Sequence, residues 1–364
     1  MINIAAPVID SEERRAVNEV IESGMLAQGP KVAELEKNWA EYCGVKHALA
    51  VNSGTAAIHC ALYAAGVKEG DEVITTPYSF IATINPILML GARPVLVDID
   101  EETFNIDVSK IEVAITEKTK AIIPVDLYGQ PCDWTELQEI AKKHNLKIVE
   151  DACQAIGAEY KGVKTGSLGD FGCFSLYATK NIMCGEGGIV TTNSDEAAAA
   201  IRSFRQHGMV APYEYADLGY NYRMSDLHGA IAVEQLKKVE EFTKKRQENA
   251  RKLNDALAGI VGIKTPTVSD NRSHVYHQYT ILLDKNIQRN QFITSLRDKG
   301  VGAGIYYPKP LHAYPHIAKL GYKIGDFPVA EDLAARVVSL PVHPKVTDED
   351  IEIIVAAVKE SING

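Results

Sequence analysis

The stretch HALAVNSGTAAIHCALYAAG, residues 47–66, decides the fold class. Its first five residues, HALAV, are nearly all apolar and predict a short buried strand. The turn NSG follows at once, and TAAIHCALYAAG then predicts a helix. A strand that leads directly into a helix begins a βαβ unit, and such units build parallel sheets.

The same alternation continues through the first two thirds of the chain. Further strands are predicted at DEVITT (71–76), PVLVDI (94–99), AIIPVDLYG (121–129) and LKIVEDA (146–152), and helices at PYSFIATINPILMLG (77–91) and WTELQEIAKKHN (134–145). Because the strands carry few polar residues, we expect helices to cover both faces of the sheet. The sequence therefore predicts an α/β fold with a mostly parallel central sheet flanked by helices.

The pattern changes near residue 240. A long helical stretch at 226–257 precedes a predicted strand at 276–283 and helices at 290–300 and 348–362. We expect residues 1–240 to form a large α/β domain. Residues 241–364 are expected to form a smaller C-terminal α+β domain.

Composition excludes several classes of protein. The 364 residues carry a net charge of −10, so there is no basic excess to neutralise the phosphates of a nucleic acid. No signal peptide is evident, and no apolar run approaches the roughly 20 residues that span a bilayer. None of the six cysteines forms a CxxC pair. We expect a cytoplasmic protein with reduced thiols, no metal site, no nucleic-acid partner and no membrane partner.

Chemistry is expected where the strands end, because ligands of parallel α/β sheets bind beyond the carboxyl ends of the strands. After residues 47–51 come Ser53, Gly54 and Thr55, two hydroxyl side chains and a glycine at a predicted helix start. Free N–H groups and the helix dipole favour an anion there, most often a phosphate. The alternative is that Ser53 or Thr55 simply caps the helix.

A carboxylate follows the strand at 146–152. Asp151 is expensive to bury unless it is hydrogen-bonded or faces a cation. A protonated pyridine nitrogen would be such a cation, and Gln154, three residues later, is placed to donate to an oxygen on the same ring. The alternative is that Asp151 caps a following helix.

One lysine has unusual surroundings. Lys180 follows a predicted strand and turn, DFGCFSLYATKNI (170–182), and precedes the glycine-rich run GEGG at 185–188. Partial burial lowers the pKa of a lysine and makes its amine nucleophilic. Ser175 offers a further hydroxyl for a phosphate. The alternative is an ordinary solvated loop lysine.

Taken together, these residues fit pyridoxal 5'-phosphate. Lys180 would hold the aldehyde of the cofactor as a Schiff base, and Asp151 would keep the pyridine nitrogen protonated, which makes the ring an electron sink. The hydroxyls and the helix start would hold the phosphate. Phe80, after another predicted strand, is placed to stack on the ring, although an aromatic residue there also suits a plain core.

The chain resembles a known family over several ordered motifs. These are VNSGTAAIHCAL (51–62), GDEVITTPYSFIAT (70–83), GARPVLVDID (91–100), KTKAIIPVDLYGQPCD (118–133), VEDACQAIGA (149–158), GSLGDFGCFS (166–175), ATKN (178–181), GEGGIVTT (185–192) and LGYNYRMSDLHGAIA (218–232). They resemble the DegT/DnrJ/EryC1/StrS aminotransferases, which are PLP-dependent sugar aminotransferases of fold type I. The resemblance implies that fold and that activity.

The resemblance also implies roles for particular residues. Lys180 would bind the cofactor and move the proton, Asp151 would pair with the pyridine nitrogen, and Gln154 would contact the phenolic oxygen. The residues that would line the phosphate site are Gly54, Thr55, Ala56 and Ser175, with Phe80 over the ring.

A homodimer with shared active sites is also implied. Asn221 would reach the phosphate of the neighbouring subunit's cofactor. Arg223 is a candidate substrate contact across the same interface, the alternative being a structural ion pair.

The late segment GIYYPKPLH (304–312) resembles relatives that act on nucleotide-linked keto sugars, so Tyr306, Tyr307 and His312 are candidate substrate contacts. The expected reaction moves an amino group from L-glutamate, or L-glutamine, to a 3- or 4-keto group of a UDP-, dTDP- or GDP-linked sugar. Some relatives carry a histidine where Tyr306 stands, and this departure leaves the sugar open.

Several alternatives remain at this point. A keto-cyclitol is the other substrate class. A PLP-dependent sugar dehydratase of the same fold would carry histidine in place of Lys180, and a non-catalytic regulator would not need Lys180, Asp151 and Gln154 together. A nicotinamide oxidoreductase lacks support, because no G-x-G-x-x-G follows the first strand.

Overall fold

The computed structural model describes residues 1–363 and is built around one large sheet. Its strands are β1 (His47–Val51), β2 (Glu72–Thr75), β3 (Arg93–Leu96), β4 (Thr119–Ile122), β5 (Lys147–Asp151), β8 (Phe171–Ser175) and β9 (Gly188–Thr192). They lie in the order β1-β9-β8-β5-β4-β2-β3. Only β9 runs against the other six strands of this sheet. The expected mostly parallel sheet is confirmed.

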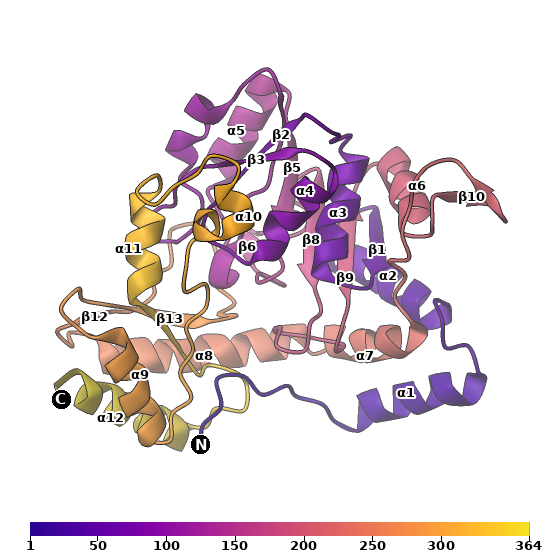
Figure 1. Ribbon diagram of the computed structural model, residues 1–364. Helices are drawn as coiled ribbons and strands as arrows, with labels where there is room; N and C mark the ends of the chain where they lie inside the picture. Colours follow the sequence, from indigo (N-terminus) through magenta and orange to yellow (C-terminus); the bar gives the residue numbers. More distant parts are fainter. Residues whose placement is uncertain (364) are drawn as a thin grey trace.

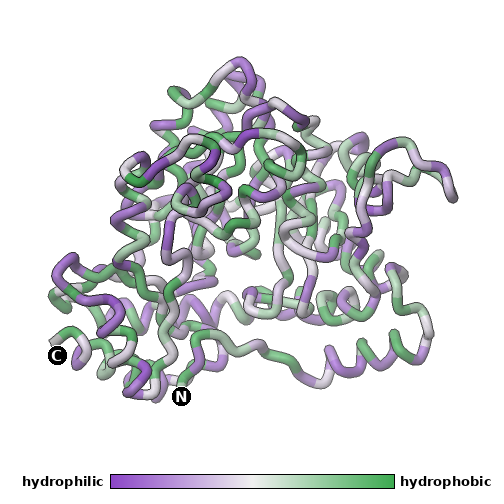
Figure 2. The backbone as a smooth tube through the Cα atoms, viewed as in Figure 1, coloured by the Kyte–Doolittle hydropathy of each residue, from purple (hydrophilic) through white to green (hydrophobic). Residues whose placement is uncertain are grey.

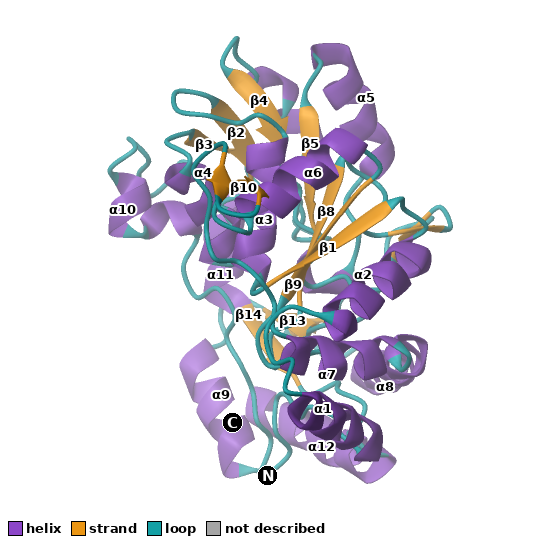
Figure 3. Ribbon diagram, turned by 90° about the vertical axis from the view of Figure 1, so that its right-hand side faces the viewer, coloured by secondary structure: helices purple, strands orange, loops and turns teal. Residues whose placement is uncertain are grey.

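Helices cover both faces of this sheet. They are α2 (Pro30–Cys43), α3 (Gly54–Ala64), α4 (Asn85–Met89), α5 (Trp134–His144), α6 (Asp195–Phe204) and α7 (Asp226–Leu236), whereas α1 (Ser11–Ser23) packs against α7. On one face lie α3, α4 and α6, and on the other lie α2, α5 and α7 (Figure 3). The expected burial of the strands on both sides follows from this arrangement.

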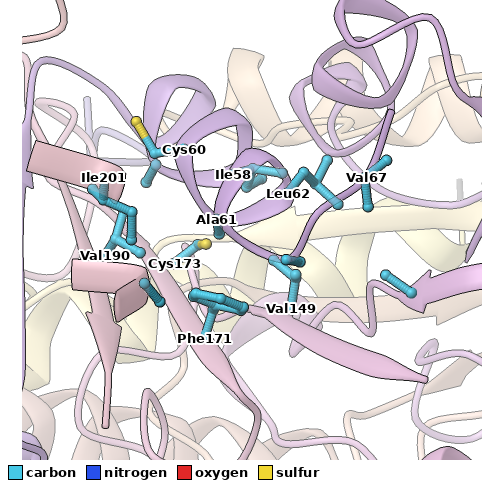
Figure 4. Packing of buried hydrophobic residues seen from close by; sticks show 14 of the residues in the cluster. Ile58, Cys60, Ala61, Leu62, Val67, Val149, Phe171, Cys173, Val190 and Ile201 are labelled. Atoms are coloured by element: carbon cyan, nitrogen blue, oxygen red, sulfur yellow. The ribbon is translucent and has the colours of Figure 1, made fainter. Parts of the chain in front are cut away.

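The stretch that decided the fold class shows how the two faces are filled. In β1, Leu49 and Val51 point into the core beneath α3, whereas Ala48 and Ala50 point into the core beneath α2. This alternation is the two-residue period of a strand. Figure 4 shows the apolar side chains of α3 packed against β5, β8 and β9, with Ala61 close to Cys173. The buried strand and the helix expected at 47–66 are both present.

A smaller sheet lies beside the large one. It consists of β12 (Ile263–Lys264), β13 (Tyr279–Leu283) and β14 (Val337–Leu340), all antiparallel. The helices of this part are α8 (Val239–Leu257), α9 (Arg289–Asp298), α10 (Pro315–Ala318), α11 (Pro328–Arg336) and α12 (Asp348–Asn363). The minor strands of the chain are β6 (Glu159–Tyr160), β7 (Val163–Lys164), β10 (Met209–Ala211) and β11 (Glu214–Tyr215).

The two ends of the chain lie near each other beside the small sheet (Figure 1). Ile2 forms a parallel bridge with Val301, and it packs against the core that α8, α9 and α12 share. In contrast, α11 packs on the large sheet, where Leu333 joins the cluster that contains Tyr78 and Leu96. The C-terminal third therefore contacts both the small core and the edge of the large sheet.

Two helices are shorter than the sequence predicted. The stretch expected to be helical over 77–91 is an extended loop up to Phe80, a 3-10 turn at Ile81–Thr83, and then α4. Pro86 has no N–H for a helix that would begin at 77, so the α-helix begins at Asn85 with the proline in its first turn. The long helix expected at 226–257 is divided into α7 and α8.

Outer helices carry one apolar side. Along α1 in Figure 2, hydrophilic and hydrophobic positions alternate, and its buried residues Ala16 and Val20 pack against Ala230 of α7.

Among residues 1–363, no helix is both long enough and apolar enough to cross a bilayer. The six cysteines are all free thiols.

Candidate active site

A cavity of about 400 Å³ opens at the carboxyl ends of β1, β5 and β8. Its walls come from the stretches that follow β1, β2, β4, β5 and β8 of the large sheet and from two late segments. The lining residues are Ser53, Gly54, Thr55, Ile58, Phe80, Ala82, Thr83, Val125, Asp151, Cys153, Gln154, Ser175, Tyr177, Thr179, Lys180, Glu186, His277, Gln278, Tyr306 and Tyr307. Most of the residues singled out in the sequence thus meet in one cavity.

The start of α3 forms one end of the cavity. Ser53 is its N-cap, and its Oγ accepts a hydrogen bond of 3.1 Å from the N–H of Ala56. The capping alternative is therefore correct for Ser53, but the same residue also lines the cavity. The first turn of a helix leaves N–H groups without intrahelical partners, and those of Gly54 and Thr55 belong to this wall. The capping side chain and the first residues of the helix therefore share one wall of the cavity.

Gly54 permits a very close approach of α3 to β8. A Cβ atom at this position would lie 2.8 Å from the Cβ of Ser175 and 3.0 Å from the Sγ of Cys153. Ordinary contacts of this kind are longer than 3.4 Å. The glycine therefore brings the start of the helix up to the hydroxyl-bearing end of β8. Ala56 is buried behind this wall and does not line the cavity.

Asp151 ends β5 and is buried. Its Oδ2 accepts a hydrogen bond of 2.8 Å from Thr83 Oγ1, and its Oδ1 accepts a longer one of 3.3 Å from the N–H of Cys153. No helix follows it, so the helix-capping alternative is wrong. No lysine, arginine or histidine of the described chain is within ion-pair distance of this carboxylate. Asp151 lines the cavity, and the protein gives its carboxylate hydrogen bonds but no cation.

Lys180 lies on the loop between β8 and β9, which Figure 1 shows descending toward the junction of α7 and α8. The two sides of the loop pair through Tyr177 and Gly185, and the N–H of Lys180 donates to the carbonyl of Tyr177 at 2.9 Å. Burial lowers the pKa of Lys180, while Cys153 and Asp151 partly oppose this shift. A solvated surface lysine would show no such shift, so the sheltered interpretation is favoured.

Gln154 is held in one orientation by two partners. Its Oε1 accepts from the N–H of Tyr128 at 2.9 Å, and its Nε2 donates to the hydroxyl of Tyr307 at 2.7 Å. Burial raises the pKa of Tyr307, so its hydroxyl stays protonated. Tyr307 has a left-handed backbone with φ of 56°, uncommon outside glycine, and it brings the late segment over the cavity.

Phe80 lies at the mouth of the cavity. It is 59% exposed in the single chain, so its ring does not belong to the core. The loop that carries Phe80 also delivers Thr83 to Asp151.

Besides Ala56, three of the candidate residues do not line the cavity. Asn221 is exposed, and its carbonyl accepts a 3.3 Å bond from Asn52, which places it beside the end of β1. Arg223 is partly buried, and within residues 1–363 it has no carboxylate at ion-pair distance, so the structure lends no support to a structural ion pair within one chain. His312 is fully buried, and its Nε2 lies 2.9 Å from Glu331 Oε1.

His312 therefore differs from the expectation of a substrate contact. Its ring packs against Phe327 at a centroid distance of 4.8 Å, inside the cluster that joins α11 to the large sheet. The resemblance of residues 304–312 to relatives that act on nucleotide-linked sugars had placed His312 among the candidate substrate contacts. The chain instead turns inward there, because Leu311 and His312 fill the apolar space beneath α11.

The sequence did not point to His277 or Thr83. Residue 277 was placed inside a predicted strand, but β13 begins only at Tyr279, and His277 turns to the cavity. Its Nδ1 lies 3.2 Å from Asn181 Oδ1, and burial together with the charge of Lys180 lowers its pKa well below the usual value. A histidine within a predicted strand carries no local signal for such a position.

The comparisons with known proteins agree with this geometry. Residues 7–359 match the profile of the DegT/DnrJ/EryC1/StrS aminotransferase family. The chain belongs to that family.

Among relatives, the chain is 41% identical to the spore coat polysaccharide biosynthesis protein SpsC of Bacillus subtilis, covering 98% of this chain and 96% of SpsC. It is 40% identical to GDP-perosamine synthase of Caulobacter vibrioides, covering 99% and 98%. The solved structure of S. venezuelae DesV in complex with a ketimine intermediate has a TM-score of 0.93 at 34% identity, covering 96% and 94%. The protein is an aminotransferase with the fold that its sequence predicted.

Proposed function

We propose that this aminotransferase uses pyridoxal 5'-phosphate to move an amino group from L-glutamate, or L-glutamine, to a 3- or 4-keto group of a nucleotide-linked sugar. One observation carries the proposal: Lys180, whose pKa burial lowers, and the buried carboxylate of Asp151 face the same cavity. An amine whose pKa is lowered and a carboxylate without a protein cation suit the aldehyde and the ring nitrogen of this cofactor.

The cavity fits the cofactor in three further respects. The hydroxyls of Ser53, Thr55 and Ser175 and the start of α3 surround one end, where a phosphate is favoured. Gly54 lets the start of α3 lie close to the end of β8, because any side chain at this position would meet Ser175. The exposed face of Phe80 is available for stacking on a flat ring.

When bound, the cofactor supplies an aldehyde that links to an amine and a ring that accepts electrons. Asp151 would hold a proton on the ring nitrogen, and Thr83 and the N–H of Cys153 keep its carboxylate in place. Gln154 contacts the ring oxygen from a position that Tyr128 and Tyr307 fix.

Lys180 acts as general base and acid once the donor has displaced it. Because its pKa is lowered, a larger share of the amine is neutral near working pH and able to accept the α-proton of the donor. The same side chain would then act as general acid and give that proton up again. With the keto sugar, Lys180 makes the transfers in the opposite direction.

We propose a homodimer with shared active sites. Apolar side chains are exposed at the mouth of the cavity and on the nearby N-terminal segment, namely Phe80, Tyr177, Met25, Leu26 and Ile21. Large apolar side chains that are exposed in the single chain are what an oligomer interface would cover. Asn221 would then reach the phosphate of the partner's cofactor, and Arg223 would contact substrate across the interface.

The sugar end of the substrate is assigned by analogy with relatives. GDP-perosamine synthase carries a nucleotide sugar in its name, and SpsC is named for polysaccharide biosynthesis. Tyr306 and Tyr307 line the outer part of the cavity and are proposed as sugar contacts. Six free thiols suit a reducing, cytoplasmic location.

The test is chemical labelling of one lysine. Protein supplied with pyridoxal 5'-phosphate should gain visible absorption, and borohydride should fix the cofactor to the peptide that contains Lys180. Lys180→Ala should lose both the label and turnover with L-glutamate and a nucleotide-linked keto sugar. Label at another lysine, or full turnover by the variant, would refute the proposal. A labelled protein that fails to turn over would instead indicate a regulator.

A further inference from the structure

Arg246 is a buried cation without an anionic partner in residues 1–363. It lies on α8 and is 6% exposed. Two other buried arginine side chains each pair with a carboxylate, Arg205 with Glu36 and Arg272 with Asp133. A buried charge is costly unless it is paired, so the unpaired guanidinium requires an explanation.

The protein satisfies few of the five N–H groups of this guanidinium. Nη1 donates to the carbonyl of Tyr276 at 3.0 Å and, weakly, to that of His277 at 3.5 Å. Nε is buried and has no partner in the described chain. Burial lowers the pKa of Arg246 to about 10, although the nearby Tyr306 opposes the shift. At neutral pH the side chain is still a cation.

Arg246 lines a small recess next to the cofactor cavity. This recess, of about 20 Å³, is lined by Arg246 together with Thr179, His277, Gln278 and Tyr306, and these last four also line the main cavity. Gln278 contributes a second orphan, because its buried Oε1 has no partner in residues 1–363 either. Rotation of that amide about its last bond would present N–H groups to the recess.

Lys180 is close to this guanidinium. Both residues line a second small recess beside α7 and α8, with a volume of about 10 Å³. The positive charges of Lys180 and Arg246 also both contribute to lowering the pKa of His277. The anion that Arg246 accepts must therefore lie near the atom at which the amino group is exchanged.

Size and position identify the anion. A recess of this volume holds about one water-sized group, which suits one end of a carboxylate and excludes a phosphate or a sugar ring. In an α-amino acid the carboxylate is bonded to the carbon that carries the amino group. In a nucleotide-linked sugar the phosphates are separated from the keto carbon by the sugar ring.

We infer that Arg246 binds the α-carboxylate of the amino donor, with Gln278 as a second donor of hydrogen bonds. The planar fork of arginine matches a carboxylate in two parallel hydrogen bonds. This inference rests on the proposed function, because it takes Lys180 as the place where the donor reacts. Arg246 would thus determine which amines act as donors, independently of the sugar.

The test compares two donors on the holoenzyme without keto sugar. L-Glutamate carries an α-carboxylate, whereas 4-aminobutanoate keeps the amino group and the distal carboxylate but lacks the α-carboxylate. Arg246→Met should lower kcat/KM for L-glutamate by about 100-fold, as expected for losing one member of a buried charge pair. The rate with 4-aminobutanoate should not change. Arg246→Lys should fall between, because it keeps the charge and loses the fork.

Binding is measured separately, by calorimetric titration with α-methyl-L-glutamate, which lacks the α-hydrogen and cannot be turned over. Arg246→Met should weaken this binding and leave the reaction of the aminated cofactor with keto sugar intact. The matched control is Arg251→Met, an exposed arginine on the same helix that pairs with Asp255. It should behave as wild type.

Several results overturn the inference. Equal losses with both donors would show that Arg246 only holds the carbonyls of residues 276 and 277. Unchanged binding of α-methyl-L-glutamate would show that the carboxylate lies elsewhere. If Arg246→Met does not fold, Arg246→Lys carries the same comparison. If the wild type converts no amino donor, the proposed function itself fails, whereas normal conversion by both variants refutes this inference alone.

Discussion

Replacing Gly54 by alanine tests the geometry of the cavity most directly. The added Cβ would lie 2.8 Å from the Cβ of Ser175 and 3.3 Å from its Cα. Ser175 cannot retreat easily, because β8 is hydrogen-bonded between β5 and β9. The start of α3 must therefore move away from β8, and it carries the N–H groups of the proposed phosphate site with it.

The magnitude follows from the overlap. A contact at 2.8 Å must lengthen to at least 3.4 Å, a shift of 0.6 Å in a closely packed interior. Overpacking of this size costs about 1 to 3 kcal/mol. For a chain of this length, 1 kcal/mol corresponds to about 2 °C in Tm. We expect Gly54→Ala to lower Tm by about 2 to 6 °C and to weaken binding of pyridoxal 5'-phosphate.

The assay is a double-mutant cycle with Ser175→Gly, which removes the atom that the new methyl group meets. Thermal unfolding and cofactor titration are measured for the wild type, both single variants and the double variant. The double variant lacks the closest clash, at 2.8 Å, and keeps only the 3.0 Å approach to Sγ of Cys153 and the 3.3 Å approach to Cα of residue 175. The two changes should therefore be non-additive, with the double variant more stable than the sum of the single variants by about 1 kcal/mol or more. A Gly54→Ala variant with wild-type Tm and cofactor affinity, or strictly additive effects, would refute the reasoning.

Three further predictions concern neighbouring groups. Asp151→Asn should reduce turnover roughly 100- to 1,000-fold in steady-state assays, because a neutral amide cannot stabilise a protonated ring nitrogen; activity within a few-fold of wild type would contradict this. Tyr307→Phe leaves Nε2 of Gln154 without its 2.7 Å partner and should destabilise the protein by about 1 to 3 kcal/mol in denaturant unfolding, whereas unchanged stability would show that the bond contributes nothing. Glu150 and Asp126 form a buried pair of carboxyl groups, and burial raises the pKa of Glu150 and raises that of Asp126 to about 7. In the folded state these groups therefore keep protons that the unfolded chain loses above about pH 4. The pair therefore weakens the fold as pH rises from about 4 to 7, and Glu150→Gln should gain stability relative to wild type over that window by at most about 1.4 kcal/mol per pH unit; a pH-independent difference would exclude the pair as the cause.

Local patterns were enough to locate most of the site. Ser53, Asp151 and Ser175 each follow or end an apolar strand, and parallel strands deliver their carboxyl ends to one edge of a sheet. Their meeting could therefore be expected before any coordinates were known. Lys180 was harder to place, because a loop lysine is usually solvated, but its loop is tied to the same strands.

Contacts between distant segments were decided only by the tertiary structure. Thr83 reaches Asp151 because a proline delays α4, and Tyr307 reaches Gln154 across 153 residues of sequence. The reversed direction of β9 and the inward turn of His312 likewise depend on how late segments pack. No short window of sequence carries such information, because a hydrogen bond between remote side chains leaves no periodicity in either one.

The sequence by itself determined the alternation of strands and helices, the covered sheet and the polar strand ends, since each follows from the chemistry of neighbouring residues. The tertiary structure alone decided which remote side chains close the cavity and that Arg246 lies buried without a carboxylate partner in residues 1–363. The physical reason is that burial and charge pairing are properties of the packed whole, and the same arginine in the same helix would be ordinary if α8 faced water.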